Sequence, residues 1–265
     1  MDGQPESADR ILLQRADGVA TVVLNNPARR NALSKAMWRD LGDTFTALAE
    51  DSSVRCVVIR GAGDKAFAAG ADISRFREER STLNLVRDYD AMVDHAQDAI
   101  RHCPHPVVAM IMGACVGGGC GIALACDIRI AGESAKFGIT ARNLGIFYPY
   151  HDIAELERLV GPAVAMEIMI EGRIMSGREA CEKGLVNRVI VDERVEAEAM
   201  EAAARIAEGA PLSARFHKKA IRRAADPRPL TDSEREEVYR FAETEDYWTG
   251  VEAFLNKKPA RFSGR

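Results

Sequence analysis

Two segments rich in small residues have the composition of a backbone site for a developing negative charge. Residues 68–73 read Ala-Ala-Gly-Ala-Asp-Ile, and Gly117, Gly118 and Gly119 follow an apolar stretch and begin an expected helix. Small residues allow a backbone to approach a ligand closely, and the N–H groups at a helix N-terminus are free to bind an anion or oxyanion. Together the segments could supply two donors to one oxygen. Removing one such donor typically costs about 3–4 kcal/mol of transition-state stabilisation.

A triple glycine also has simpler interpretations. Taken alone, it is typical of a tight turn or of close helix packing. A phosphate-binding loop is excluded because no Gly-Lys-Ser/Thr follows the turn. A dinucleotide-binding turn is excluded because the spacing is not Gly-x-Gly-x-x-Gly.

The elements around these segments predict an α/β fold. Apolar runs at 54–59 and 107–112 are typical of buried strands, and a hairpin is expected around residues 11–24. Helical periodicity is expected at 34–48 and 84–101, and most of the chain after residue 152 reads as helical. Strands that alternate with helices over the first two-thirds imply βαβ units.

Length and charge exclude several classes of protein. The 265 residues are 47% hydrophobic, enough for one large domain, and the net charge of −4 gives no basic field for nucleic acid. No apolar stretch reaches a bilayer-spanning length, so we expect no membrane partner. Residues 1–9 are polar and acidic, which predicts a disordered lead-in rather than a signal peptide. The six cysteines read as small buried hydrophobes in a reducing cytoplasm, and the histidines lack zinc-ligand spacing from them.

Ordered motifs along nearly the whole chain resemble the crotonase (enoyl-CoA hydratase/isomerase) superfamily. They are Asn-Ala-Leu at 31–33, the 67–73 segment, Pro-Val-Val-Ala at 106–109, the 117–120 turn, Cys-Asp-Ile-Arg at 126–129, Phe-Gly at 137–138, Asn-Leu-Gly-Ile at 143–146, Gly-Leu-Val at 184–186 and the tail at 252–258. The resemblance implies a spiral of ββα units as an acyl-CoA-binding core at 10–195. A C-terminal helical trimerisation region would occupy 196–265, in a homotrimer or dimer of trimers. No metal or cofactor is implied beyond the coenzyme A of the substrate.

The resemblance also implies roles for individual residues. The N–H groups of Ala71 and Gly118 would hold the thioester carbonyl as it becomes an enolate. Residues implied to bind coenzyme A are Arg30, Ala32, Ala69, Asp72 and Ile73, with Phe254 and Lys257 from the tail.

Two departures from the family pattern concern catalysis. Hydratases carry one glutamate where this chain has Gly121 and a second where it has Ala141. Hydration needs one group to activate water and another to deliver a proton. Either loss should lower the rate by on the order of 10²–10⁴. Ordinary hydratase activity is therefore not expected.

The segment after Gly145 adds titratable groups that hydratases lack there. Asn-Leu-Gly at 143–145 followed by Tyr148 resembles methylmalonyl-CoA decarboxylases, as does Thr-Glu-Asp-Tyr at 244–247, although those enzymes have a histidine in place of Ala71. Tyr148 is then a candidate proton donor, or a residue that only fills the acyl pocket. Asp152 is a candidate base for double-bond migration, or only a carboxylate favoured by a helix N-terminus.

Three further side chains are candidates for the acyl pocket. Tyr150 could fill it, and His151 could line it or simply belong to the next helix. Arg142 could pair with a substrate carboxylate or face solvent. The sequence therefore predicts an enzyme that stabilises a CoA-thioester enolate, a decarboxylase or isomerase rather than a hydratase. A catalytically silent acyl-CoA-binding protein is the alternative from another class.

Overall fold

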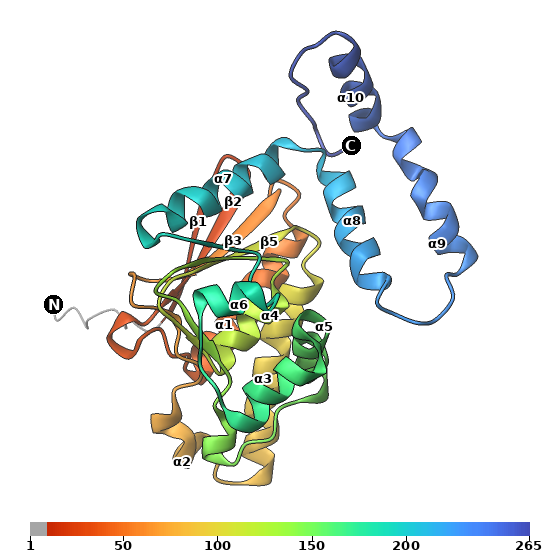
Figure 1. The fold of residues 1–265 in the computed structure, drawn as a ribbon. Helices are drawn as coiled ribbons and strands as arrows, with labels where there is room; N and C mark the ends of the chain where they lie inside the picture. The colour runs from red at the N-terminus through yellow and green to blue at the C-terminus, as the bar shows by residue number, and fades with distance from the viewer. Residues whose placement is uncertain (1–9) are drawn as a thin grey trace, which may run out of the picture.

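Two β-sheets carry the fold in the computed structural model, which describes residues 10–265 (Figure 1). The larger sheet has the strand order β1-β2-β3-β5-β7-β10. Only its β1–β2 pair is antiparallel, whereas the other pairs are parallel. Its strands are β1 (Arg10–Ala16), β2 (Val19–Asn25), β3 (Cys56–Gly61), β5 (Val107–Ile111), β7 (Ile128–Gly132) and β10 (Arg188–Ile190). The predicted lead-in at 1–9 lies outside the described residues.

The smaller sheet has the order β4-β6-β8-β9. Its strands are β4 (Ala66–Ala68), β6 (Ala114–Val116), β8 (Lys136–Gly138) and β9 (Met175–Ser176). Each of three successive units sends its first strand to the larger sheet, its second strand to the smaller sheet, and then forms a helix. These units are β3-β4-α3, β5-β6-α4 and β7-β8-α5. The predicted crotonase-type spiral of ββα units is confirmed.

The helices follow the predicted pattern in most places. They are α1 (Lys35–Glu50), α2 (Phe76–Glu79), α3 (Leu83–His102), α4 (Gly118–Ala125), α5 (Tyr150–Met166), α6 (Gly177–Glu182), α7 (Val195–Glu208), α8 (Pro211–Arg223), α9 (Asp232–Glu237) and α10 (Glu245–Leu255). Short 3₁₀ helices are η1 (Pro27–Arg29), η2 (Ile73–Arg75), η3 (Ala141–Leu144), η5 (Asp192–Arg194) and η6 (Val238–Glu243), and η4 (Glu167–Glu171) is a π-helical turn. Ser34 caps α1 by accepting a hydrogen bond from the Met37 N–H, as expected for a serine at this position.

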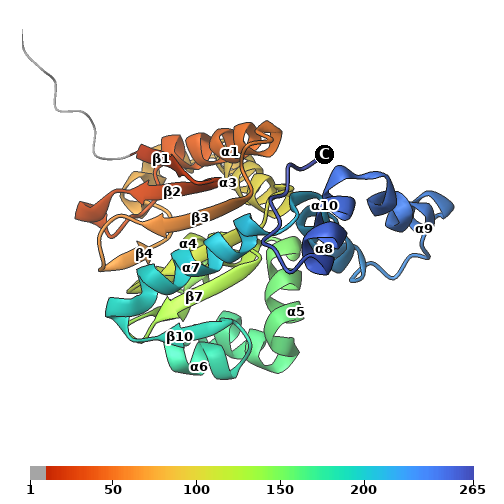
Figure 2. The ribbon, with the colours of Figure 1, turned by 90° about the horizontal axis from the view of Figure 1, so that it is seen from above.

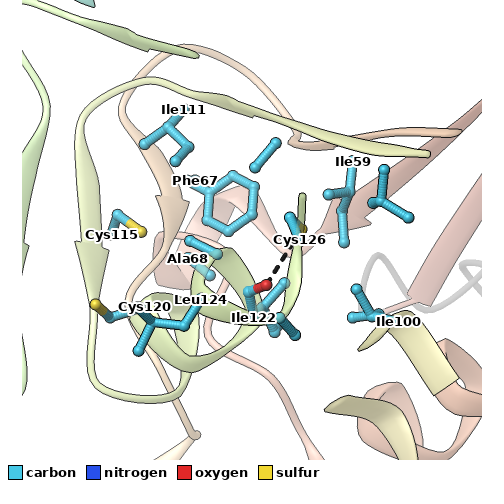
Figure 3. Packing of buried hydrophobic residues seen from close by; sticks show 14 of the residues in the cluster. Ile59, Phe67, Ala68, Ile100, Ile111, Cys115, Cys120, Ile122, Leu124 and Cys126 are labelled. Carbon is cyan, nitrogen blue, oxygen red and sulfur yellow. Dashed lines mark hydrogen bonds between the residues drawn. The ribbon is translucent and has the colours of Figure 1, made fainter. Parts of the chain in front are cut away.

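The space between the two sheets and helices α1, α3 and α4 is filled by apolar side chains. Figure 3 shows Phe67 of β4 among Ile59, Ile111 and Ile122. The predicted cysteine packing is confirmed for five of the six, which are buried, while Cys181 is half-buried. This packing fixes β4, which leads into the 69–73 segment, and α4, which begins at Gly118.

The part of the chain that extends away from the two sheets begins after α7, later than residue 195. Helix α7 packs against the larger sheet and shares a buried cluster with β3, β5 and β7 through Val195, Ala199 and Ala203. Helices α8, α9 and α10 instead extend to one side of the sheets (Figures 1 and 2). The predicted boundary between residues 195 and 196 thus falls at the start of α7, whose alanine-rich face is buried on the larger sheet. We call residues 211–265 the C-terminal arm.

Candidate active site

Two backbone segments meet at the ends of β4 and β6, neighbouring strands of the smaller sheet. Gly70 and Gly117 have φ of +94° and +53°, values that side-chain-bearing residues rarely adopt. A Cβ placed on Gly70 would lie 3.2 Å from the Gly118 nitrogen, and one on Gly118 would lie 3.7 Å from the Ala71 nitrogen. The structure thus brings together the two predicted donor segments.

The N–H groups of Ala71 and Gly118 are available to a ligand. Gly118 is the first residue of α4, so its N–H has no partner within the helix. Within residues 10–265, neither N–H donates a hydrogen bond to a protein acceptor. The indole of Trp38 lies against Gly118, because a Cβ there would come within 2.8 Å of the ring. The role of this pair as an oxyanion hole stays a prediction, and the geometry fits it.

A cavity of about 280 Å³ opens beside these donors. It is lined mainly by apolar and aromatic groups, with a few charged side chains, as is typical of a small-molecule site. Its wall is formed by side chains and backbone from several elements. They are Trp38 of α1, residues 69–71 and 116–118, Phe76 and Arg80, five residues of α3, and residues of the 140–152 segment. From α3 come Tyr89, Asp90, Val93, Asp94 and Gln97.

Neither hydratase glutamate position contributes a carboxylate to this cavity. Ala141 lines the wall with a methyl group only. Gly121 is buried, and a Cβ on it would lie 2.4 Å from the terminal amide of Gln97. The Gln97 side chain, which is 1% exposed, therefore fills the space where a residue-121 side chain would extend.

Asp152 places a carboxylate in the cavity wall from the first turn of α5. Its side chain is 6% exposed. With Gln97 Nε2 turned toward Asp152, that amide donates to Oδ1 at 2.7 Å and Oδ2 at 3.1 Å. Burial raises the pKa of Asp152, and the nearby His151 and Arg101 only partly offset this. A carboxylate with a raised pKa is a better proton acceptor near neutral pH than an ordinary one.

Tyr148 lines the same cavity, as expected for a residue of the acyl pocket. Burial raises its pKa, and the carboxylate of Asp152 also disfavours the phenolate. The side chain therefore stays a neutral phenol that can donate a proton or hydrogen bond.

Asp94 is a cavity residue that the sequence motifs do not reveal. Burial raises its pKa as well, and its Oδ1 atom is buried with no hydrogen-bond donor within the described part of the chain. His151 Nε2 lies 3.5 Å from Asp94 Oδ1 and 3.4 Å from Asp152 Oδ1. One sequence signal was available: Asp90, Asp94 and Gln97 recur at helical spacing along the inward face of α3.

Three residues that the sequence offered as candidates for the acyl pocket do not line this cavity. Tyr150 is the first residue of α5, is 93% exposed and does not line the cavity. Arg142 points away, and its guanidinium donates to the carbonyls of Ile170 and Glu171. His151 does not line the cavity either, but it touches the two aspartates that do.

Five of the seven residues predicted to bind coenzyme A fall into three groups around the 69–73 segment. Ala69 and Ile73 line the cavity, with Ile73 56% exposed at its rim. Arg30 and Ala32 lie on a neighbouring stretch of the chain. The Arg30 carbonyl accepts a hydrogen bond from the Ala69 N–H at 2.9 Å. Asp72 is buried, caps η2 by accepting from Ser74, and pairs with Arg29 at 2.6 Å. The Asp72 carboxylate therefore stabilises the loop around η2, and its charge is already paired with Arg29.

Phe254 and Lys257 lie elsewhere, in the C-terminal arm. Phe254 is 84% exposed and borders a second cavity of about 1090 Å³ between α8, η6 and α10. Neither residue lines the first cavity. The arm extends away from the sheets (Figure 2), so their role as coenzyme A contacts stays a prediction.

Two other properties bear on the kind of site. No group of three His, Cys, Asp or Glu side chains within residues 10–265 could hold a metal ion. In the same part of the chain, no helix is long and apolar enough to cross a bilayer.

Comparison with known proteins decides the family. The model of the enoyl-CoA hydratase/isomerase family matches residues 14–265. The chain belongs to the enoyl-CoA hydratase/isomerase family. It is similar to the crotonyl-CoA hydratase of Syntrophomonas wolfei, with 34% identity over 260 residues that cover 96% of this chain and 98% of the relative. It is also 32% identical to the 2,3-dehydroadipyl-CoA hydratase of Escherichia coli, over 96% of this chain and 99% of the relative.

Solved structures agree with this family assignment. An enoyl-CoA hydratase/carnithine racemase from Magnetospirillum magneticum superposes with a TM-score of 0.94 and 45% identity, covering 96% of each chain. Membership of the family makes an acyl-CoA thioester the substrate class. The relatives cited carry hydratase names, so the resemblance of the 143–148 segment to methylmalonyl-CoA decarboxylases stays a prediction.

Proposed function

We propose that this protein is a CoA-thioester isomerase that moves a double bond through an enolate, with Asp152 as the base. The observation that carries the proposal is the buried Asp152 carboxylate in the wall of the cavity that the Ala71 and Gly118 N–H groups border. Isomerisation needs one group that can accept a proton and return it. The chain supplies that group, but not at either hydratase position.

The proposed reaction balances without a co-reactant. The carbonyl oxygen of a 3-enoyl-CoA accepts hydrogen bonds from the two N–H groups. The Asp152 carboxylate takes the proton from C2, and the electrons of the C–H bond move to the thioester oxygen, giving a dienolate stabilised by the donors. The carboxyl then delivers a proton to C4, and the electrons return to form the C2–C3 double bond of a 2-enoyl-CoA.

Ordinary hydration is less well supported. Position 141 offers only a methyl group, and the space at position 121 is filled by the Gln97 amide. Water activation and proton delivery from the usual two places are therefore both missing.

Decarboxylation of a malonyl-type thioester is the second candidate, and Tyr148 favours it. Loss of CO₂ needs no base, only an out-of-plane carboxylate and a stabilised enolate, and a neutral phenol in the cavity can then protonate C2. The carboxylates of Asp94 and Asp152 in the cavity wall weigh against a carboxylate-bearing substrate, since like charges repel. A silent acyl-CoA-binding protein would use the same cavity without turnover.

The proposal includes self-association through the C-terminal arm, as a trimer or a dimer of trimers. The arm leaves several large apolar side chains exposed, which is typical of a protein interface. They include Ile221, Tyr239, Phe241, Trp248, Phe254 and Leu255. In such an assembly the tail residues Phe254 and Lys257 would meet the coenzyme A of a neighbouring copy.

The test is turnover of 3-hexenoyl-CoA by the purified protein and by Asp152→Asn. Conversion to 2-hexenoyl-CoA by the wild type, lost in the variant, would support the proposal. Release of CO₂ from methylmalonyl-CoA with no effect of Asp152→Asn and a large effect of Tyr148→Phe would favour the second candidate. Tight binding of acyl-CoA with no turnover of either would favour the silent binder.

A further inference from the structure

A single imidazole nitrogen joins two carboxyl groups of the cavity wall. His151 Nε2 lies 3.4 Å from Asp152 Oδ1 and 3.5 Å from Asp94 Oδ1. The two aspartates come from different helices, α5 and α3, so the arrangement depends on the packing of those helices and not on local sequence.

Asp94 and Asp152 differ in their access to water. The Asp152 side chain is 6% exposed, whereas the side chains of Asp94 and His151 are each 42% exposed. Asp94 nevertheless has one buried oxygen without a hydrogen-bond donor in the described chain, and it lines the same cavity as Asp152. Asp94 thus has one face toward the substrate space and another toward solvent.

Other charged groups surround Asp94, His151 and Asp152, but none of those described below contacts both aspartates as His151 does. Asp90 and Asp98 lie one turn away on α3, and Asp90 pairs with Arg80 at 2.6 Å. Arg101, also on α3, approaches Asp152 at 3.5 Å, and its guanidinium further contacts Asp98 and Glu155. Thus Asp90 and Asp98 each have a cationic partner of their own, whereas the partner of Asp94 is His151.

We propose that Asp94 is a second proton-carrying residue of the site and that His151 passes a proton between Asp94 and Asp152. The proposal rests on the isomerase function proposed above. After Asp152 has taken the C2 proton, its O–H bond breaks as His151 Nε2 accepts that proton. The imidazolium then gives the proton to the Asp94 carboxylate, restoring neutral imidazole. No atom other than the proton moves, and no co-reactant is needed.

The relay has a consequence that a single-base mechanism lacks. A proton that stays on buried Asp152 returns to the same substrate molecule, so C4 receives the hydrogen that left C2. His151 Nε2 faces both carboxyl groups, so a proton that it accepts passes to Asp94, whose half-exposed side chain exchanges it with water. In D₂O, the relay therefore predicts deuterium at C4 of the product.

The experiment measures deuterium at C4 of 2-hexenoyl-CoA formed from 3-hexenoyl-CoA in a single turnover in D₂O. Wild type, Asp94→Asn and His151→Gln are compared, with Asp88→Asn as the control, since Asp88 is an exposed aspartate of the same helix outside the cavity. We expect deuterium at C4 with wild type and with Asp88→Asn. We expect the deuterium content to fall at least about tenfold in both relay variants, because they break the path to solvent.

A second readout separates this inference from the proposed function. Exchange of the C2 hydrogens of butyryl-CoA in D₂O needs enolate formation but no double bond, so it is measured for the same four proteins. Wild-type isomerisation with unchanged deuterium content in Asp94→Asn would overturn the relay alone. Wild type that neither isomerises nor exchanges would overturn both. A third outcome is that wild type exchanges the C2 hydrogens of butyryl-CoA but does not isomerise 3-hexenoyl-CoA, and that Asp94→Asn loses the exchange. That outcome would overturn the isomerase function and support the relay.

Discussion

The amide of Gln97 occupies the space into which a side chain at Gly121 would grow, with only 2.4 Å from that amide to a Cβ built on Gly121. The same amide donates two hydrogen bonds to Asp152. One residue of α3 thus fills the site of an absent hydratase glutamate and holds the carboxylate that we propose as the base. This contact therefore connects the absence of a glutamate at position 121 with the presence of a carboxylate at position 152.

Replacing Gln97 by leucine should move the pH dependence of the reaction. The Gln97 hydrogen bond lowers the pKa of Asp152, against the larger effect of burial. Its removal raises that pKa further, so a higher pH is needed to form the carboxylate. We expect the acidic limb of kcat/KM to shift to higher pH in Gln97→Leu. Gln14→Leu, on β1 and away from the cavity, is the control and should leave the profile unchanged.

Replacing Asp152 by asparagine should abolish isomerisation without removing acyl-CoA binding. Loss of a general base typically lowers the rate by on the order of 10²–10⁴. Binding measured by calorimetry with a non-reactive acyl-CoA should stay within a few-fold of wild type. A parallel loss of binding would mean that Asp152 supports the fold rather than the chemistry.

The same variant should change how stability depends on pH. The pKa of Asp152 is raised in the folded protein, so the native state binds more protons than the unfolded chain between the two pKa values. The stability that Asp152 contributes is therefore present below its unfolded pKa and falls as pH rises through the folded one. Thermal unfolding across pH 4 to about 8 should show a smaller decline for Asp152→Asn than for wild type.

Alanine at Gly70 should disturb both proposed oxyanion donors. The residue has φ of +94°, and a Cβ there would lie 3.1 Å from the Val116 carbonyl oxygen and 3.2 Å from the Gly118 nitrogen. We expect Gly70→Ala to lower kcat by on the order of 10²–10³, the usual effect of losing one such donor. Gly63→Ala is the matched control, because Gly63 has φ of +71° with open space around it. Equal losses of activity in the two variants would contradict the role of the Gly70 turn.

An aspartate at Phe254 should weaken self-association. Phe254 belongs to the exposed apolar surface of the C-terminal arm, and a charge there would be desolvated in an interface. Light scattering during size-exclusion chromatography should show a lower molar mass for Phe254→Asp than for wild type. Leu13→Asp, an exposed leucine of β1, is the control. An unchanged mass for Phe254→Asp would exclude this face as the interface.

The sequence predicted the fold and the glycine-containing segments because their signals are local. Positive φ at Gly70 and Gly117 and the strand that precedes each of them depend on residues only a few positions away. Whole-chain motifs then gave the order of the ββα units. The positions of Ala71 and Gly118 followed from the same motifs.

The rest of the site depends on how distant elements pack. The contact between Gln97 and Asp152 joins α3 to α5, and no motif encodes it. Asp94 was missed for the same reason. Tyr150 was misplaced because α5 begins at Tyr150 itself, two residues before the predicted start, which directs its side chain to solvent. The tail residues Phe254 and Lys257 lie away from this cavity because the arm leaves the core after α7.

The most direct test of the central claim is a mass-spectrometric turnover assay of the purified protein with crotonyl-CoA, 3-hexenoyl-CoA and methylmalonyl-CoA. Enolate chemistry without the hydratase glutamates predicts conversion of 3-hexenoyl-CoA to its 2-enoyl isomer, dependent on Asp152, with little addition of water to crotonyl-CoA. Rapid hydration of crotonyl-CoA that survives Asp152→Asn would contradict the account, because it would require a water-activating group that this cavity wall does not supply at Gly121 or Ala141.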